Sequence, residues 1–153
     1  MSAIRGFTLI EAIVVTGLLA LIGACTASVN LSTYEHASVQ KERQSLVEAL
    51  EHARAEALER ICEGEECVSG ALHGVSIQRD RYVIFQGSSY ASRDVGADEI
   101  IEANPAFSHT GLSEVIFASS TGETNTSGAI TITDTTGHTS AVTMGREGQI
   151  DFQ

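Results

Sequence analysis

Residues 7–31 read FTLIEAIVVTGLLALIGACTASVNL, and Glu11 is the single charged residue among them. About twenty apolar residues in a helix are enough to span the roughly 30 Å hydrocarbon layer of a bilayer. The stretch therefore predicts a transmembrane helix. Arg5 lies on its short N-terminal side, which predicts that this end stays in the cytoplasm and that the rest of the chain emerges on the opposite face.

The composition of the whole chain predicts one β-rich head domain. Its 153 residues allow about one domain of ordinary size once the apolar stretch is set aside. Twenty Asp and Glu against nine Lys and Arg give a formal net charge of −11. So acidic a chain lacks the electrostatic attraction that supplies most non-specific affinity for nucleic acid, which is disfavoured as a partner. A single Pro, no Trp and fourteen Gly suit short strands and turns.

Glu11 needs a specific explanation, because a carboxylate inside an apolar helix costs several kcal/mol unless something neutralises it. It closes the hexapeptide Gly6-Phe7-Thr8-Leu9-Ile10-Glu11, which resembles the cleavage motif of type IV prepilins. The resemblance implies that a prepilin peptidase removes residues 1–6 by cutting after Gly6. It further implies that Phe7 becomes the N-methylated N-terminus, and that Glu11 pairs with the terminal amine of a neighbouring fibre subunit. Such a pair would set the axial register of subunits, because any other offset leaves a charge unpaired.

Two other interpretations of this segment remain open. Glu11 could simply lie at the edge of a bilayer. Ile22-Gly23-Ala24-Cys25 is similar to the lipobox of bacterial lipoproteins, in which the Cys is lipidated. The lipobox pattern favours Leu at its first position, however, and the apolar character continues beyond Cys25. Without lipidation, Cys25 would be a small apolar side chain in a helix interface.

Residues 32–62 predict an amphipathic helix. Apolar residues recur at steps of three, four or seven, which places them on one face; they are Val39, Leu46, Leu50, Ala53, Ala57 and Ile61. No Pro or Gly occurs between Ala24 and Glu63, so we expect this helix to continue the preceding one as a single rod.

Two smaller features of this region carry alternatives. Glu48, His52 and Glu56 share a helix face and could hold a metal ion, but no further ligand is evident. We therefore favour a solvated face with helical charge pairs, and expect neither a metal nor a cofactor. Cys62 and Cys67 enclose four residues, and they form either a local disulfide in an oxidising compartment or two free thiols.

The second half of the chain alternates between apolar and polar residues, which predicts strands. Residues 74–78 and 81–85 predict a hairpin around Arg79-Asp80. Further strands are expected at 114–118, 129–133, 138–144 and 149–152. Residues 87–110 are weakly patterned, and we expect a long connection whose outer part is mobile.

The resemblance extends beyond the leader. Residues 45–57, SLVEALEHARAEA, are similar to the helix of the GspH/FimT family, and Phe117, Gly122, the alternating Ile130–Thr133 and a closing strand after Gly148 are similar to its head. The resemblance implies an α+β pilin fold. A long N-terminal helix, with a transmembrane half at 7–31 and an amphipathic half at 32–62, would pack on an antiparallel β-sandwich-like head at 63–153.

The function implied is that of a minor pilin or pseudopilin, a structural subunit for assembly or tip formation of a type IV pilus or type II secretion pseudopilus. It would be a single-pass inner-membrane protein with an extracytoplasmic head before entering the fibre with other pilins or pseudopilins. No nucleophile elbow, metal-ligand spacing or phosphate loop points to an enzyme. The alternatives are a binding module at a pilus tip (a DNA receptor or an adhesin) and a lipoprotein. DNA uptake is disfavoured because Gln149 and Asp151 occupy the positions of the arginines in DNA-binding family members.

Overall fold

The computed structural model describes residues 8–26, 31–62, 70–124 and 126–152. The chain divides into two compact units, Met1–Glu35 and His36–Gln153. The first unit holds helix α1 (Leu9–Thr26) and the beginning of helix α2 (Leu31–Glu59). The second unit holds the rest of α2 together with all the strands of the described part.

The helices α1 and α2 are separate elements, with 18 and 29 residues. The predicted fold class, one long N-terminal helix packed on a pilin-type head, is therefore wrong. Residues 26–30 read TASVN, and Thr, Ser, Val and Asn all have lower helix propensity than Ala or Leu. These residues were a stronger signal than the absence of Gly and Pro.

No helix in the described part of the chain is long and apolar enough to cross a bilayer. This finding corrects the predicted transmembrane segment at 7–31. It also overturns the predicted single-pass location in the inner membrane with an extracytoplasmic head.

In the second unit, α2 supplies one side of the hydrophobic core. The predicted stripe is buried at Val39, Leu46, Leu50, Ala53 and Ala57, and Ala49 is buried with them. The prediction was wrong for Ile61, which lies beyond the end of α2 and is 36% exposed. The helix ends at Glu59. The next residue, Arg60, has a left-handed φ of 59°, and the amide of Ile61 then donates to the carbonyl oxygen of Glu56 at 3.0 Å. This left-handed residue stops the helix where Gly more often does.

The strands form two four-stranded antiparallel sheets, with orders β3-β2-β1-β5 and β4-β6-β7-β8. Their bounds are β1 His73–Ile77, β2 Arg81–Gln86, β3 Asp94–Glu102, β4 Ser108–Gly111, β5 Glu114–Phe117, β6 Gly128–Thr133, β7 Thr139–Met144 and β8 Ile150–Phe152. The predicted hairpin is confirmed by the pairing of β1 with β2. The strands expected at 114–118, 129–133, 138–144 and 149–152 correspond to β5, β6, β7 and β8.

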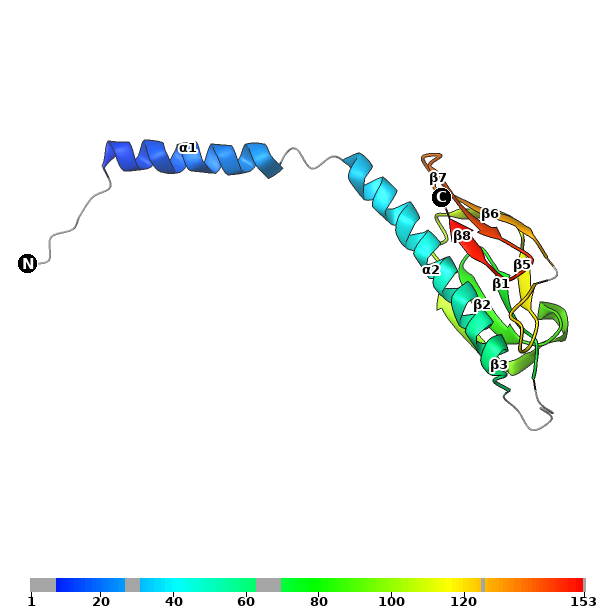
Figure 1. Cartoon of the computed structure of the whole chain (residues 1–153). Helices are drawn as coiled ribbons and strands as arrows, with labels where there is room; N and C mark the ends of the chain where they lie inside the picture. The colour runs from blue at the N-terminus through cyan, green and yellow to red at the C-terminus, as the bar shows by residue number, and fades with distance from the viewer. Residues whose placement is uncertain (1–7, 27–30, 63–69, 125, 153) are drawn as a thin grey trace, which may run out of the picture. The chain divides into compact units, whose positions relative to one another are not determined.

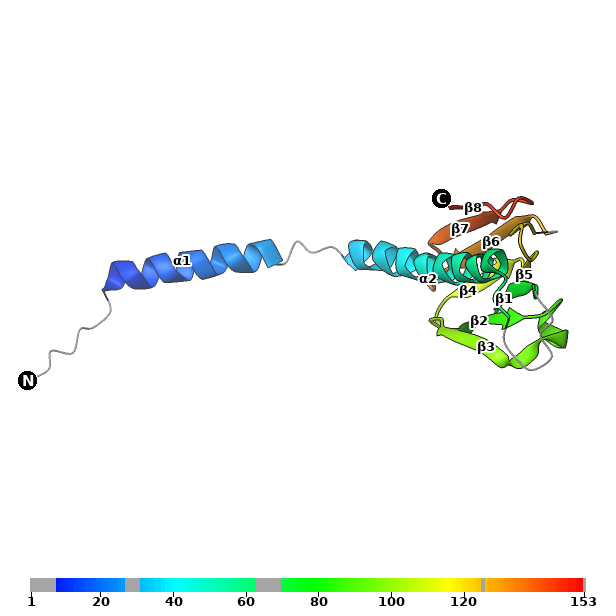
Figure 2. The same ribbon diagram turned by 60° about the horizontal axis from the view of Figure 1, so that its bottom comes forward.

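Figures 1 and 2 show α2 lying along both sheets, with β1 to β3 on one side of it and β6 to β8 on the other. One face of each sheet therefore contributes to a shared core with the helix. The strand residues of that core include Val75, Tyr82, Ile84, Val115, Phe117, Ile130, Ile132, Val142 and Met144.

The long connection expected at 87–110 is wrong. It contains a short 3-10 helix, Tyr90–Ser92, and the strands β3 and β4. Both strands lie at the outer edge of a sheet. An edge strand is held by backbone hydrogen bonds to one neighbour and can remain largely exposed, so it does not need the apolar alternation by which a strand is recognised.

Candidate functional site

Glu11 lies in the first turn of α1. Its backbone amide donates to Thr8 Oγ1 at 3.3 Å, so Thr8 caps the helix. The order Thr8-Leu9-Ile10-Glu11 is that of a capping box, in which the acidic residue at the third helical position stabilises the helix start. A carboxylate at this end also interacts favourably with the helix dipole. Glu11 therefore has a local structural role whatever else it does.

The other predicted residues of the N-terminal motif, Gly6 and Phe7, lie outside the described residues. Cys25 belongs to α1 by its backbone. Cys62 is disulfide-bonded, and Cys67, its predicted partner, again falls in a part of the chain that is not described.

Every side chain from Thr8 to Ala24 is exposed within the described structure. Nine of them are large and apolar: Leu9, Ile10, Ile13, Val14, Val15, Leu18, Leu19, Leu21 and Ile22. Their exposed fractions run from 44% at Val15 to 81% at Leu9. A helix that is apolar all round is normally buried by something else, because such a surface is unstable in water.

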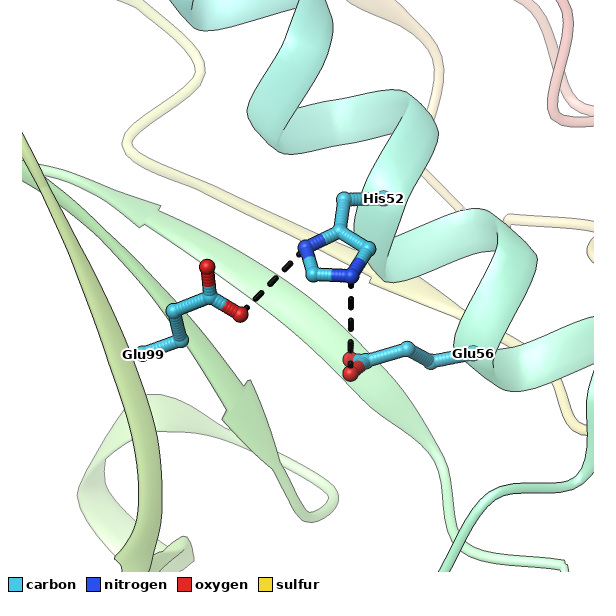
Figure 3. Close-up of side chains that lie close together, drawn as sticks. All are labelled: His52, Glu56 and Glu99. Carbon is cyan, nitrogen blue, oxygen red and sulfur yellow. Dashed lines mark ion pairs between the residues drawn. The ribbon is translucent and has the colours of Figure 1, made fainter.

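A second cluster joins α2 to the edge strand β3 (Figure 3). The ring of His52 lies between two carboxylates, with Nδ1 3.4 Å from Glu99 Oε2 and Nε2 4.0 Å from Glu56 Oε1. One ligand atom from each residue lies within 4.8 Å of the other two. The arrangement therefore brings one imidazole and two carboxylates together, with one ring nitrogen of His52 turned toward each carboxylate.

The helix and the sheet position this cluster by their own periodicities. His52 and Glu56 are four residues apart, so they lie on the same face of α2. Glu99 is opposite Ile84 in the pairing of β3 with β2, and directly opposed residues point to the same face of a sheet. Ile84 belongs to the core shared with α2. Glu99 therefore points toward the helix.

His73, at the start of β1, lies behind this cluster. It is opposite Gln86, two residues beyond Ile84, so it faces the same way. Only 3% of His73 is exposed, and its Nε2 lies 4.0 Å from Glu56 Oε2. Glu56, His73 and Glu99 together line a pocket of about 130 Å³. Glu56 is thus within reach of two imidazoles.

A third group of polar side chains is buried between α2, β2 and β4. The hydroxyl of Tyr82 donates to Glu42 Oε1 at 2.7 Å and lies 2.8 Å from His109 Nε2. Because the single hydroxyl proton goes to Glu42, His109 must donate from Nε2. Its Nδ1 is then an unprotonated acceptor, and it has no hydrogen-bond partner among the described residues. Glu42 Oε2 also accepts from the amide of Asn104 at 3.3 Å.

Burial controls the protonation of this group. It raises the pKa of Tyr82, and the hydrogen bond to Glu42 raises it further, so the phenol stays neutral. Burial also lowers the pKa of His109, with the nearby Glu42 carboxylate opposing part of that shift. The group is therefore a neutral tyrosine and a neutral histidine around one carboxylate, which suits a structural network better than proton transfer.

The sequence reveals these two groups only in part. His52 and Glu56 were found by their helical spacing, but Glu48 from the same pattern is not in the cluster. Glu99 was missed because β3 carries no strand signal. Tyr82 is 40 residues from Glu42 and 27 residues from His109 along the chain. Nothing in a single sequence indicates that the three side chains meet.

Comparison with family models, with curated proteins and with solved structures finds no match to this chain. The family resemblance noted in the sequence therefore stays a prediction, and no related protein supports the pilin and secretion roles expected from it.

Proposed function

We propose that this chain is a non-catalytic fibre subunit of the prepilin type, a minor pilin or pseudopilin that assembles through α1 with related subunits. The observation that carries the proposal is the character of α1. Its described apolar side chains are exposed on all sides, and its single charge lies in the first turn. Helices of this kind are stable when they pack among one another.

The size of the apolar surface favours association over an isolated helix. Burying a large aliphatic side chain contributes about 1.5–3 kcal/mol, so nine of them contribute on the order of 14–27 kcal/mol before entropic costs. Burying one carboxylate costs several kcal/mol unless it is paired. The apolar term is the larger one. The Glu11 carboxylate therefore affects the alignment of neighbouring helices more than it affects their association.

The prepilin resemblance supplies the partner for that carboxylate. A prepilin peptidase would cut after Gly6, and the new amine at Phe7 of a neighbouring subunit would pair with Glu11. Pilins or pseudopilins of a type IV pilus or a type II secretion pseudopilus would be the other subunits. The capping-box geometry offers a competing, purely local explanation for the same residue.

The substitution Glu11→Gln separates the two explanations, because Gln can replace Glu in a capping box but carries no charge. We expect normal leader cleavage but at least about a tenfold loss of incorporation into fibres, since an unpaired buried amine costs ~3–5 kcal/mol. Glu11→Ala should lose both the cap and the pair. Glu48→Gln, which removes an exposed charge elsewhere, is the matched control.

Fibre incorporation is measured by immunoblotting of sheared fibres against whole cells. Wild-type incorporation of Glu11→Gln would leave Glu11 with its capping role alone. The mass of the mature protein tests the processing step independently: an N-methylated chain beginning at Phe7 supports the proposal, and a lipidated chain beginning at Cys25 contradicts it.

A further inference from the structure

We propose that His52, Glu56, Glu99 and His73 form a binding site for one zinc ion, or a transition-metal ion of similar preference, between α2 and β3. The proposal is independent of the fibre role, since every residue of the site lies in the unit His36–Gln153. The four side chains offer two imidazole nitrogens and two carboxylates, a donor set that zinc uses in proteins.

One distance in the cluster, between His52 and Glu99, already matches the spacing of two ligands on a tetrahedral ion. Ligands at ~2.0–2.2 Å from a tetrahedral zinc ion lie about 3.3–3.6 Å from one another. The 3.4 Å between His52 Nδ1 and Glu99 Oε2 already has this value. Both carboxylate ligand atoms of the three-residue cluster lie within 4.8 Å of the imidazole and of each other. Closing the remaining gap needs a shift of roughly 1 Å, which rotation of the Glu56 side chain supplies.

His73 lies outside the group of three whose ligand atoms are within 4.8 Å of one another, and it approaches that group from the buried side through Glu56. Its Nε2 is 4.0 Å from Glu56 Oε2, only a few tenths of an ångström beyond the spacing of two tetrahedral ligands. His73 on β1 is paired with Gln86 of β2, and Glu99 on β3 is paired with Ile84 of β2. Two ligands thus come from a paired sheet and two from one helix face. Ligands on regular elements are held more precisely than ligands on loops.

The neighbouring charges agree with one divalent ion. The site contains two carboxylates and two imidazoles that are neutral as ligands, so an ion of charge +2 balances it. The nearby Asp98 is engaged elsewhere, because Arg93 Nε donates to its carboxylate at 2.8 Å. The pocket of about 130 Å³ lined by Glu56, His73 and Glu99 is larger than the roughly 30 Å³ that one water molecule occupies in the liquid.

The donors also select the kind of metal. Calcium and magnesium prefer sites built entirely from oxygen, whereas imidazole nitrogen favours zinc, nickel, copper and related ions. A metal bound here would tie the exposed edge strand β3 to α2. Its structural effect would be to fix one side of the sheet against the helix.

The test is a titration of the metal-free full chain, kept in a mild detergent, with zinc chloride by isothermal calorimetry. We expect one ion per chain. His52→Ala and Glu99→Gln should each weaken binding at least tenfold, since even loss of a residue that supports a ligand costs about 10–100-fold. Both positions are well exposed, with 46% and 54% of their side chains accessible, so these variants should fold. Calcium and magnesium in excess should not displace zinc.

Two carboxylates provide matched controls. Glu48 lies one helical turn before His52 and is exposed, and Glu102 lies on β3 but points to the opposite face from Glu99. Glu48→Gln and Glu102→Gln should leave the affinity unchanged. Cobalt in place of zinc should give the visible absorption of a tetrahedral site in the wild type, and this absorption should disappear in His52→Ala.

Three outcomes would overturn the proposal. The first is the absence of saturable zinc binding. The second is an affinity that is the same in His52→Ala and Glu99→Gln as in the wild type, which would mean adventitious surface binding. The third is binding that falls equally in the Glu48→Gln and Glu102→Gln controls, which would mean attraction by the general negative charge of the chain.

Discussion

Gly148 passes so close to Gly122 that a Cβ on Gly148 would overlap the carbonyl oxygen of Gly122. The same Cβ would lie 2.9 Å from Nε of Arg54, whose Nη2 donates to the carbonyl oxygen of Glu147 at 3.3 Å. Gly148 also has a φ of 74°, in the left-handed region. The turn before β8 and the turn after β5 therefore meet the helix at a point where only glycine fits.

Gly148→Ala should consequently destabilise the protein strongly. Gly137→Ala is the matched control, because Gly137 has a φ of 92° but nothing within 4 Å of the added Cβ. The control should lose about 1–2 kcal/mol from backbone strain alone. Gly148→Ala should lose roughly 3 kcal/mol or more, since overlap with backbone is added to the strain. Urea unfolding measures both, and equal losses would show that the close approach is unimportant.

Tyr82→Phe should weaken the buried network around Glu42. The variant removes the hydroxyl that donates to Glu42 Oε1 at 2.7 Å and leaves a buried carboxylate short of a donor. We expect a loss of about 1.5–3 kcal/mol in the free energy of unfolding, as for hydrogen bonds to charged groups. Tyr90→Phe is the control, and it should change stability by less than about 0.5 kcal/mol because its ring contact with Arg93 is kept.

His109 should make stability depend on pH below neutrality. Burial holds the pKa of His109 below its ordinary value of 6.5, so the unfolded state binds more protons between those two values. The stabilisation is therefore fully present above about pH 6.5 and is lost as the pH falls toward the lower, folded pKa. Unfolding of the wild type and of His109→Gln, compared from pH 8 to pH 5, measures it. A difference between the two that does not change with pH would contradict the assignment.

The disulfide at Cys62 should join Cys67 rather than Cys25. Peptide mapping by mass spectrometry without reduction should recover residues 62 and 67 in one linked fragment. The bond closes a loop with four residues between the two cysteines, so its loss in Cys62→Ser should cost about 2 kcal/mol by the loop-entropy estimate. Recovery of a fragment that links Cys62 to Cys25 would contradict the pairing.

The sequence predicted those helices and strands in which burial of one face makes apolar residues recur at a regular spacing. The stripe of α2 and the strands β1, β2, β5, β6 and β7 all carry such a period, because one face of each packs into the core. Strand β3 was missed for the opposite reason. Most of its residues are exposed or half-exposed, and Asp94, Gly96 and Asp98 are poor strand formers.

The end of α1 and the candidate metal site could not be predicted from the sequence. The single rod was inferred from the lack of Gly and Pro, whereas a run of ordinary residues with modest helix propensity accompanies the end of α1 at Thr26. The His52 cluster needs Glu99 from a strand that had no pattern. Its assembly depends on the register of β3 against β2, which is a property of pairing between distant segments and leaves no trace in local spacing.

Strand β3 is the outer strand of its sheet, and its nine residues include four carboxylates: Asp94, Asp98, Glu99 and Glu102. An uncovered outer strand offers unpaired backbone groups to any similar strand that approaches it. Two copies of this strand would bring their negative charges together, so repulsion would oppose a continuous sheet running from one molecule into the next. This repulsion would disfavour amyloid-like association of neighbouring molecules through the edge strand β3.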